Sequence, residues 1–156
     1  MDYADALSKV FLFKDMPLAQ RSKLATIAHE YSLPAHERLF DEGDTGDEMY
    51  VIVLGTAKVF KKREGGDPEE VATLATGSYF GEMAFLIDAH ERTAMVETQE
   101  RTIALGFKEE ELLALCDKDP EVAHYLYRAL ARGLALRLRN TTRDQAYFKA
   151  MALKHD

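Results

Sequence analysis

The chain has 156 residues, 47% of them hydrophobic and 30% charged, and its formal net charge is -7 at pH 7. This length supports one domain with a full core but not two ordinary domains, and the composition excludes an intrinsically disordered chain. The acidic balance disfavours a domain that grips a nucleic-acid backbone, because such domains are usually basic. No run of about eighteen apolar residues is present, and the N-terminus carries Asp2 and Asp5 where a secretion signal would be positive. We therefore expect a single cytoplasmic domain that does not enter a membrane.

The first part of the chain, residues 1–30, has the apolar spacing that indicates helices. Two short helices are expected, over 3–13 and over 17–30. Pro17 opens the second, where a first-turn proline is well tolerated.

Residues 31–107 consist of short apolar runs separated by turn residues, and seven of the nine glycines lie between positions 43 and 81. Val, Ile, Tyr, Phe and Thr fill these runs, which is typical of strands joined by tight turns. The pattern predicts about eight antiparallel strands that close as a jelly-roll barrel. Helices at both ends and one short internal helix make the expected fold α+β, mainly β, in one domain over 1–156.

Helical periodicity returns in residues 108–156, where Asp119 and Pro120 have the form of an N-cap and a first-turn proline. The last helix is expected to be ~50 Å long, which exceeds the width of a small barrel. One stripe of it turns polar at its middle: Leu130, Leu134, Leu138, Thr141, Gln145 and Phe148. We expect this stripe to pair with its copy in a second chain; burial against the chain's own barrel is the alternative. Arginines at 128, 132, 137, 139 and 143 are interpreted as a solvated helix face.

The segment FGEMAFLIDAHERTA, residues 80–94, is not explained by packing. Gly81, at the end of a strand and the start of a short apolar helix, indicates that the backbone approaches something closely. The free N–H groups of such a helix start favour an anion, and Arg92 offers a fork of donors that matches a phosphate, with the Thr93 hydroxyl beside it. Glu82 would repel a phosphate, so it must face a donor: Arg92, and a sugar hydroxyl of the same ligand. A sugar phosphate with a free hydroxyl near its phosphate fits this set.

The segment resembles the phosphate-binding cassette of cyclic nucleotide-binding domains, whose pattern is Phe-Gly-Glu-x-Ala, a short helix and loop, then Arg followed by a small hydroxyl residue or alanine. The upstream stretches EGDTGDEMYVIVLGTAKVF and LATGSYFGE are also similar to that family, and the resemblance covers roughly residues 5–140. HERTA, with Glu91 before Arg92 where kinase and channel members usually have proline, looks like the catabolite-activator branch of bacterial regulators.

The resemblance implies a cyclic nucleotide, cAMP or cGMP, held by cassette residues Phe80, Gly81, Glu82, Met83, Ala84, Arg92 and Thr93. Val59 and Val71 match apolar positions of the pocket wall, and Thr141 and Thr142 match a Thr-Ser pair that reaches the adenine, one of the two from the partner subunit. Thr93 is common where cGMP is preferred, so the base stays open. Members of that branch continue into a helix-turn-helix domain, whereas this sequence ends at Asp156, so DNA binding is not expected.

The expected function is a stand-alone cyclic nucleotide sensor, without enzyme activity, that forms a homodimer through its last helix and signals to an unidentified effector protein by movement of the C-terminal helices. No cofactor or metal is expected besides the nucleotide ligand. A cupin-like metal-dependent barrel enzyme is one alternative, but no pair of the five histidines has ligand spacing. A scaffold barrel that has lost nucleotide binding is another, and the joint presence of Gly81, Glu82, Arg92 and Thr93 argues against it. The single cysteine, Cys116, is expected to be buried rather than reactive.

Overall fold

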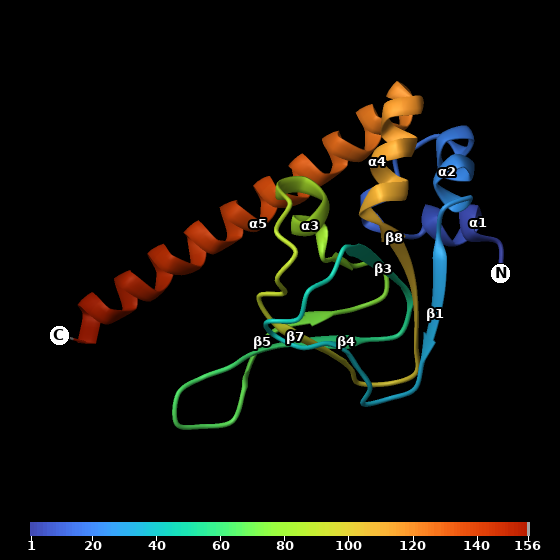
Figure 1. Cartoon of the computed structure of the whole chain (residues 1–156). Coiled ribbons are helices and arrows are strands. Elements are labelled where there is room, and N and C mark those ends of the chain that lie inside the picture. The colour runs from blue at the N-terminus through green and yellow to red at the C-terminus, as the bar shows by residue number, and fades with distance from the viewer. Residues whose placement is uncertain (156) are drawn as a thin grey trace.

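The computed structural model describes residues 1–155, with side chains throughout except at 143–148, 150 and 152–155. Helices from the two ends of the chain lie together on one side of the β-sheets, and the last helix extends far beyond them (Figure 1). The strands occupy the middle of the chain, from residue 29 to residue 108.

Eight strands form two four-stranded sheets in which every neighbouring pair is antiparallel. The first sheet has the order β1-β8-β3-β6, made of β1 (His29–Leu33), β8 (Thr102–Lys108), β3 (Glu48–Leu54) and β6 (Tyr79–Phe80). The second has the order β2-β7-β4-β5, made of β2 (Arg38–Phe40), β7 (Met95–Thr98), β4 (Ala57–Lys61) and β5 (Glu69–Leu74). The antiparallel strands predicted from the sequence are confirmed. The closed eight-stranded barrel is not, because each sheet ends in edge strands instead of continuing into the other.

The helices are α1 (Tyr3–Ser8), the 3-10 turn η1 (Phe11–Phe13), α2 (Leu18–Ala25), α3 (Glu82–Ile87), α4 (Glu109–Lys118) and α5 (Pro120–His155). The helix expected over 17–30 is wrong at its C-terminal end. It stops at Ala25, and His29 and Glu30 belong to β1, where they lie opposite Gly106 and Leu105 of β8. The helix ends before His29 because the following residues pair with β8. The spacing of apolar residues within one segment does not indicate whether another strand will pair with it.

The main core joins the terminal helices to the first sheet. Its fully buried side chains include Leu7, Phe13, Leu24, Met49, Phe107, Leu112, Leu126 and Leu130. A smaller core of Ile52, Ala57, Phe80 and Val96 lies between the two sheets. Phe80 and Tyr50 stack with ring centroids 5.2 Å apart, and this aromatic contact anchors the start of the segment that follows Phe80.

The first part of helix α5 packs on the domain. Asp119 caps it, because its carboxylate accepts hydrogen bonds from the backbone N–H groups of Glu121 and Val122. Leu130 is 1% exposed, whereas Leu134 is 38% and Leu138 is 68% exposed, so the expected overhang of the helix is present. Gln145 and Phe148, the last members of the predicted stripe, lie outside the described side chains.

Candidate functional site

The cassette, residues 80–94, begins where β6 ends. Gly81 has φ +80° and precedes the first turn of α3, a backbone conformation that side chains with a Cβ rarely adopt. The close packing around position 81 also requires glycine, because a Cβ there would lie 2.8 Å from the carbonyl oxygen of Glu48 and 3.0 Å from Nη1 of Arg92. The close backbone approach inferred from the sequence is therefore present, and one of the groups approached is the guanidinium of Arg92.

Arg92 is held inside the protein, with only 7% of its surface exposed. Its Nη2 donates to the carbonyl of Glu48 at 2.9 Å, and its guanidinium carbon lies 4.4 Å from the centre of the Phe40 ring. A Cβ at Gly46 would come within 2.5 Å of its Nε, so the guanidinium occupies a slot between Gly46 and Gly81. Its buried Nε has no hydrogen-bond partner among the described residues. A buried cation with an unsatisfied donor is costly unless an anion completes it.

A cavity of about 590 Å³, here called the cassette cavity, opens between the cassette, strands β4 and β5, and α5. Most of the predicted site residues line it: Val59, Phe80, Gly81, Glu82, Met83, Ala84, Arg92 and Thr93. The structure does not bring three others to this wall. Val71 on β5 is 49% exposed while its neighbours Ala72, Thr73 and Leu74 line the cavity. Thr141 and Thr142 are exposed on α5 and are not part of the lining.

Glu82 has a partner that the sequence did not indicate. Its carboxylate is 5% exposed, and its Oε1 accepts a hydrogen bond of 2.6 Å from Nη1 of Arg137 on α5. Arg137 also donates from Nη2 to the carbonyl of Tyr79 at 3.2 Å, and its guanidinium lies 4.7 Å from the Tyr79 ring centre. Sequence reasoning expected Arg92 to face Glu82. The only available signal for Arg137 was its position one helical turn before Thr141, on the same face of α5.

Charges of both signs surround the cassette cavity. Arg92 and Arg137 supply two cations, and Glu82 and Glu91 supply two carboxylates. Burial raises the pKa of Tyr79, and the nearby guanidinium of Arg137 partly opposes that rise. The charges of Glu82 and Arg137 cancel within their ion pair. Arg92 is therefore the buried cation of the lining that has no carboxylate partner among the described residues.

A second group of polar side chains meets outside the cavity, at the end of the cassette helix. Ligand-capable atoms of Asp88, His90 and Glu109 lie within 4.8 Å of one another, and Nε2 of His90 is 2.6 Å from Oε2 of Glu109. Residue spacing did not indicate this cluster, because Glu109 is brought in by the start of α4. Its hydrogen bond ties the cassette loop to α4.

The two antiparallel sheets, the glycine-opened cassette and the buried guanidinium on the cavity wall are the features that make up the candidate site. Residues 30–119 match the family model of the cyclic nucleotide-binding domain, and the chain belongs to that family. It is 38% identical over 101 residues to the cyclic AMP receptor protein of Thermus thermophilus, a match that covers 65% of this chain and 46% of the receptor.

Two further relatives have regulatory roles in their names or titles. The regulatory subunit of the cAMP-dependent protein kinase of Mucor circinelloides is 35% identical over 94 residues, which cover 60% of this chain and 22% of the subunit. The N-terminal domain of a transcriptional regulator from Streptomyces coelicolor superimposes with a TM-score of 0.74 and 31% identity, covering 88% of this chain and 94% of that one. The chain thus spans less than half the length of the receptor and the kinase subunit.

The chain is thus a member of the cyclic nucleotide-binding domain family with catabolite-activator-type relatives. No DNA-binding domain lies within the residues that the structure describes, where α5 is the last element. None of the helices in the same part of the chain has both the length and the hydropathy that crossing a lipid bilayer requires.

Proposed function

We propose that the chain binds a 3′,5′-cyclic mononucleotide, cAMP or cGMP, in the cassette cavity and acts as a regulatory sensor without catalytic activity. The observation that carries this proposal is Arg92: a buried guanidinium on the cavity lining, beside the start of α3, whose Nε has no hydrogen-bond partner in the part of the chain that the structure describes. A cyclic phosphate carries one negative charge and exposed oxygens, which suits a guanidinium and free backbone N–H groups. Of the relatives compared, the Thermus receptor and the Mucor kinase subunit are named for cyclic AMP.

The ribose and the base are assigned to neighbouring parts of the lining. Oε1 of Glu82 is occupied by Arg137, and among the described residues no hydrogen bond reaches its Oε2, which is therefore available to a ribose hydroxyl. Val59 and Leu74, on β4 and β5, provide apolar contacts for the nucleoside. Thr141 and Thr142, one turn beyond Arg137 on exposed α5, would contact the base after α5 closes or from a partner chain.

The Glu82–Arg137 pair gives the proposed sensor its mechanical link, because it joins the first turn of the cassette helix to α5. A ligand that draws α3 towards Arg92 would move the Glu82 end of this pair. The ligand shifts the population of α5 positions only by its difference in affinity for them. We assign the output to an effector protein that reads the position of α5.

The decisive experiment is calorimetric titration of the purified chain with cAMP, cGMP and linear AMP. A charge-assisted hydrogen bond contributes about 1.5–3 kcal/mol, so Arg92→Ala should weaken binding of the preferred cyclic nucleotide by about ten- to a hundredfold or more. Arg92→Lys, which keeps the charge but loses the fork, should be intermediate. Arg101→Ala is the matched control, because Arg101 is exposed and lies outside the cavity lining. A parent chain that binds neither cyclic nucleotide, or an Arg92→Ala variant that binds as well as the parent, contradicts the proposal.

Dimerisation through α5 is a separate part of the proposal. Leu134 and Leu138 form an exposed apolar stripe that continues from buried Leu130. Sedimentation equilibrium should give a dimer for the parent chain and a monomer for Leu134→Glu combined with Leu138→Glu. Leu136→Glu changes an equally exposed leucine on another face of α5 and should leave the dimer intact. A monomeric parent chain at about 100 μM would refute this part, since that concentration detects any affinity stronger than about −5.5 kcal/mol.

A further inference from the structure

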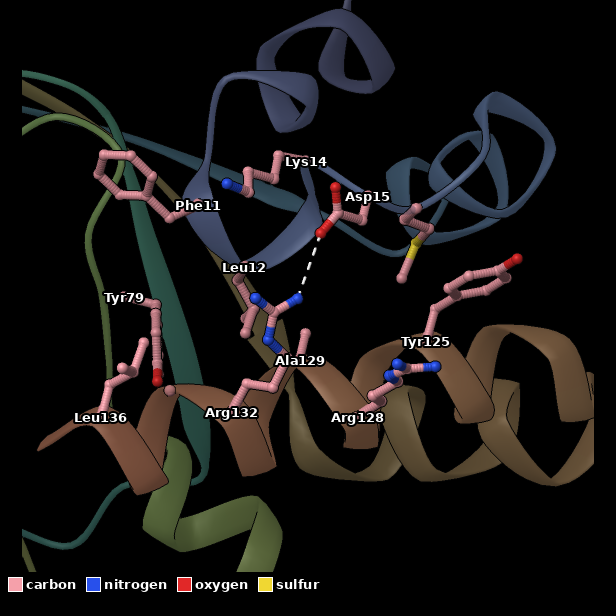
Figure 2. A pocket seen from close by; sticks show the side chains of 12 residues that line it. Phe11, Leu12, Lys14, Asp15, Tyr79, Tyr125, Arg128, Ala129, Arg132 and Leu136 are labelled. Atoms are coloured by element: carbon pink, nitrogen blue, oxygen red, sulfur yellow. Dashed lines mark hydrogen bonds and ion pairs between the residues drawn. The ribbon is translucent and has the colours of Figure 1, made fainter. Parts of the chain in front are cut away.

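A second cavity lies between η1 and α5, and no site residue predicted from the sequence lines it (Figure 2). Its volume is about 520 Å³, within the range of about 300–1,000 Å³ typical of small-molecule sites. We call it the basic cavity, because its lining includes Lys14, Arg128 and Arg132 beside the apolar Phe11, Leu12 and Met16.

The basic cavity carries positive charge in an acidic chain. Lys14, Arg128 and Arg132 border it, opposed by the single carboxylate of Asp15, whereas the whole chain has a net charge of -7. Arg128 and Arg132 are one helical turn apart and so project from the same face of α5. Arg132 pairs with Asp15 at 3.5 Å, as the dashed line in Figure 2 shows, which leaves the cavity with excess positive charge. This arrangement favours an anionic ligand.

Apolar surface adjoins these charges. Leu12 and Met16 are 6% and 4% exposed and form the floor, while Phe11 and Leu136 remain 72% and 54% exposed at the rim. An inorganic ion would leave this apolar rim in water. A ligand with an aromatic or acyl body would cover it and gain from its burial.

Tyr79 adds an unsatisfied polar group to the wall. The residue is 8% exposed, and its hydroxyl, packed against Gly133, has no hydrogen-bond partner among the described residues. A buried hydroxyl without a partner is costly, and a ligand oxygen would supply the missing acceptor after a small shift of the ring. Tyr79 also lines the cassette cavity, so the two cavities share one wall.

We propose that the basic cavity is a second binding site, for an organic anion whose phosphate or carboxylate group lies between Lys14, Arg128 and Arg132. Its aromatic or acyl body rests on Leu12, Met16 and Phe11. The site is distinct from the cassette cavity and does not depend on Arg92, which lines only the other cavity.

The test uses 1-naphthyl phosphate as the probe, titrated into the full chain by calorimetry. Inorganic phosphate supplies the anion alone and 1-naphthol the body alone, and each should bind at least about tenfold more weakly than the probe. A naphthyl carboxylate in a parallel titration distinguishes a carboxylate site from a phosphate site. A probe that does not bind, or that binds no better than both fragments, overturns the proposal.

Two perturbations locate the probe. Arg128→Ala combined with Arg132→Ala should weaken binding at least about tenfold, whereas Arg101→Ala combined with Arg139→Ala removes the same charge from exposed positions outside the lining and should stay within about twofold. Ala129→Phe keeps every charge but fills the cavity, and should also weaken binding at least about tenfold. Thermal unfolding of each variant verifies the fold.

Arg92→Ala separates this inference from the proposed function. Naphthyl phosphate binding should stay within about twofold in that variant even if cyclic nucleotide binding is lost. A probe that loses affinity in Arg92→Ala, and keeps it in the double variant and in Ala129→Phe, occupies the cassette cavity and refutes the second site. If cyclic nucleotides fail to bind while the probe behaves as expected, the proposed function fails and the second site stands.

Discussion

Replacing Gly133 by alanine tests the contact that separates the two cavities. Gly133 lies within α5, where a glycine normally weakens a helix by about 1 kcal/mol relative to alanine. At this position, however, a Cβ would overlap the hydroxyl oxygen of Tyr79 and lie 3.0 Å from its Cζ. The side chain of Tyr79 or the helix itself must move to accept Gly133→Ala.

The magnitude follows from two opposing effects. Overpacking of this kind lowers the free energy of unfolding by about 1–3 kcal/mol, and the better helix propensity of alanine raises it by about 1 kcal/mol. Gly133→Ala should therefore lower the free energy of unfolding by about 0–2 kcal/mol instead of raising it. In a Tyr79→Phe background the clashing oxygen is gone, and the same change should become neutral or stabilising. The coupling between the two changes should be about 1–3 kcal/mol.

Urea unfolding followed by circular dichroism of the four members of this cycle measures the coupling. Tyr79→Phe alone should be neutral or stabilising, by up to about 1–3 kcal/mol, because the buried hydroxyl it removes has no hydrogen-bond partner in the described part of the chain. Ala131→Gly, at an exposed position of α5, calibrates the helix-propensity effect in the same helix. If Gly133→Ala stabilises the protein equally in both backgrounds, the packing of Tyr79 against α5 is wrong.

Three further predictions concern single groups. Arg137→Ala leaves the buried Glu82 carboxylate without its cation. Because the Arg137 side chain is 50% exposed, the free energy of unfolding should fall by only about 1–2 kcal/mol. An unchanged urea midpoint would contradict a stabilising Glu82–Arg137 ion pair. The hydrogen bond from Lys23 holds the pKa of Asp119 below its ordinary value, so its stabilising contribution is present above the unfolded-state pKa and is lost as the pH falls through the folded-state pKa. Asp119→Ala should consequently lower the melting temperature at pH 7 more than at pH 3, and an equal shift at both would refute the linkage. Burial raises the pKa of the Cys116 thiol to about 11. Iodoacetamide at pH 8 should therefore alkylate Cys116 in the folded protein at least about tenfold more slowly than it alkylates free cysteine, and urea unfolding should remove this protection. Rapid labelling of the folded protein would show an exposed thiol.

Much of the fold was predictable because its signals are local. The run Glu48–Leu54 is one of the expected strands, since its β-branched and aromatic residues are flanked by turn residues. Asp119 caps α5 as its position before Pro120 indicates. The end of α2 and the closure of the sheets were not predictable in this way. Both depend on which strand pairs with which, and that choice is made between segments distant in the chain.

The sequence by itself determined the pattern of residues 80–94: a glycine between a strand and a short helix, a carboxylate in the first turn of that helix, and an arginine ten positions after the carboxylate. These features depend on residue type and short spacing, so they can be read without a structure. Only the tertiary structure decided that Arg137 would pair with Glu82 and that the exposed Arg128 and Arg132 would border a cavity. The physical reason is that α5 crosses both the cassette helix and the N-terminal turn η1. The partners of Arg132 and Arg137 therefore come from segments more than fifty residues away in the chain. Helical periodicity indicates only the face of the helix on which a side chain lies.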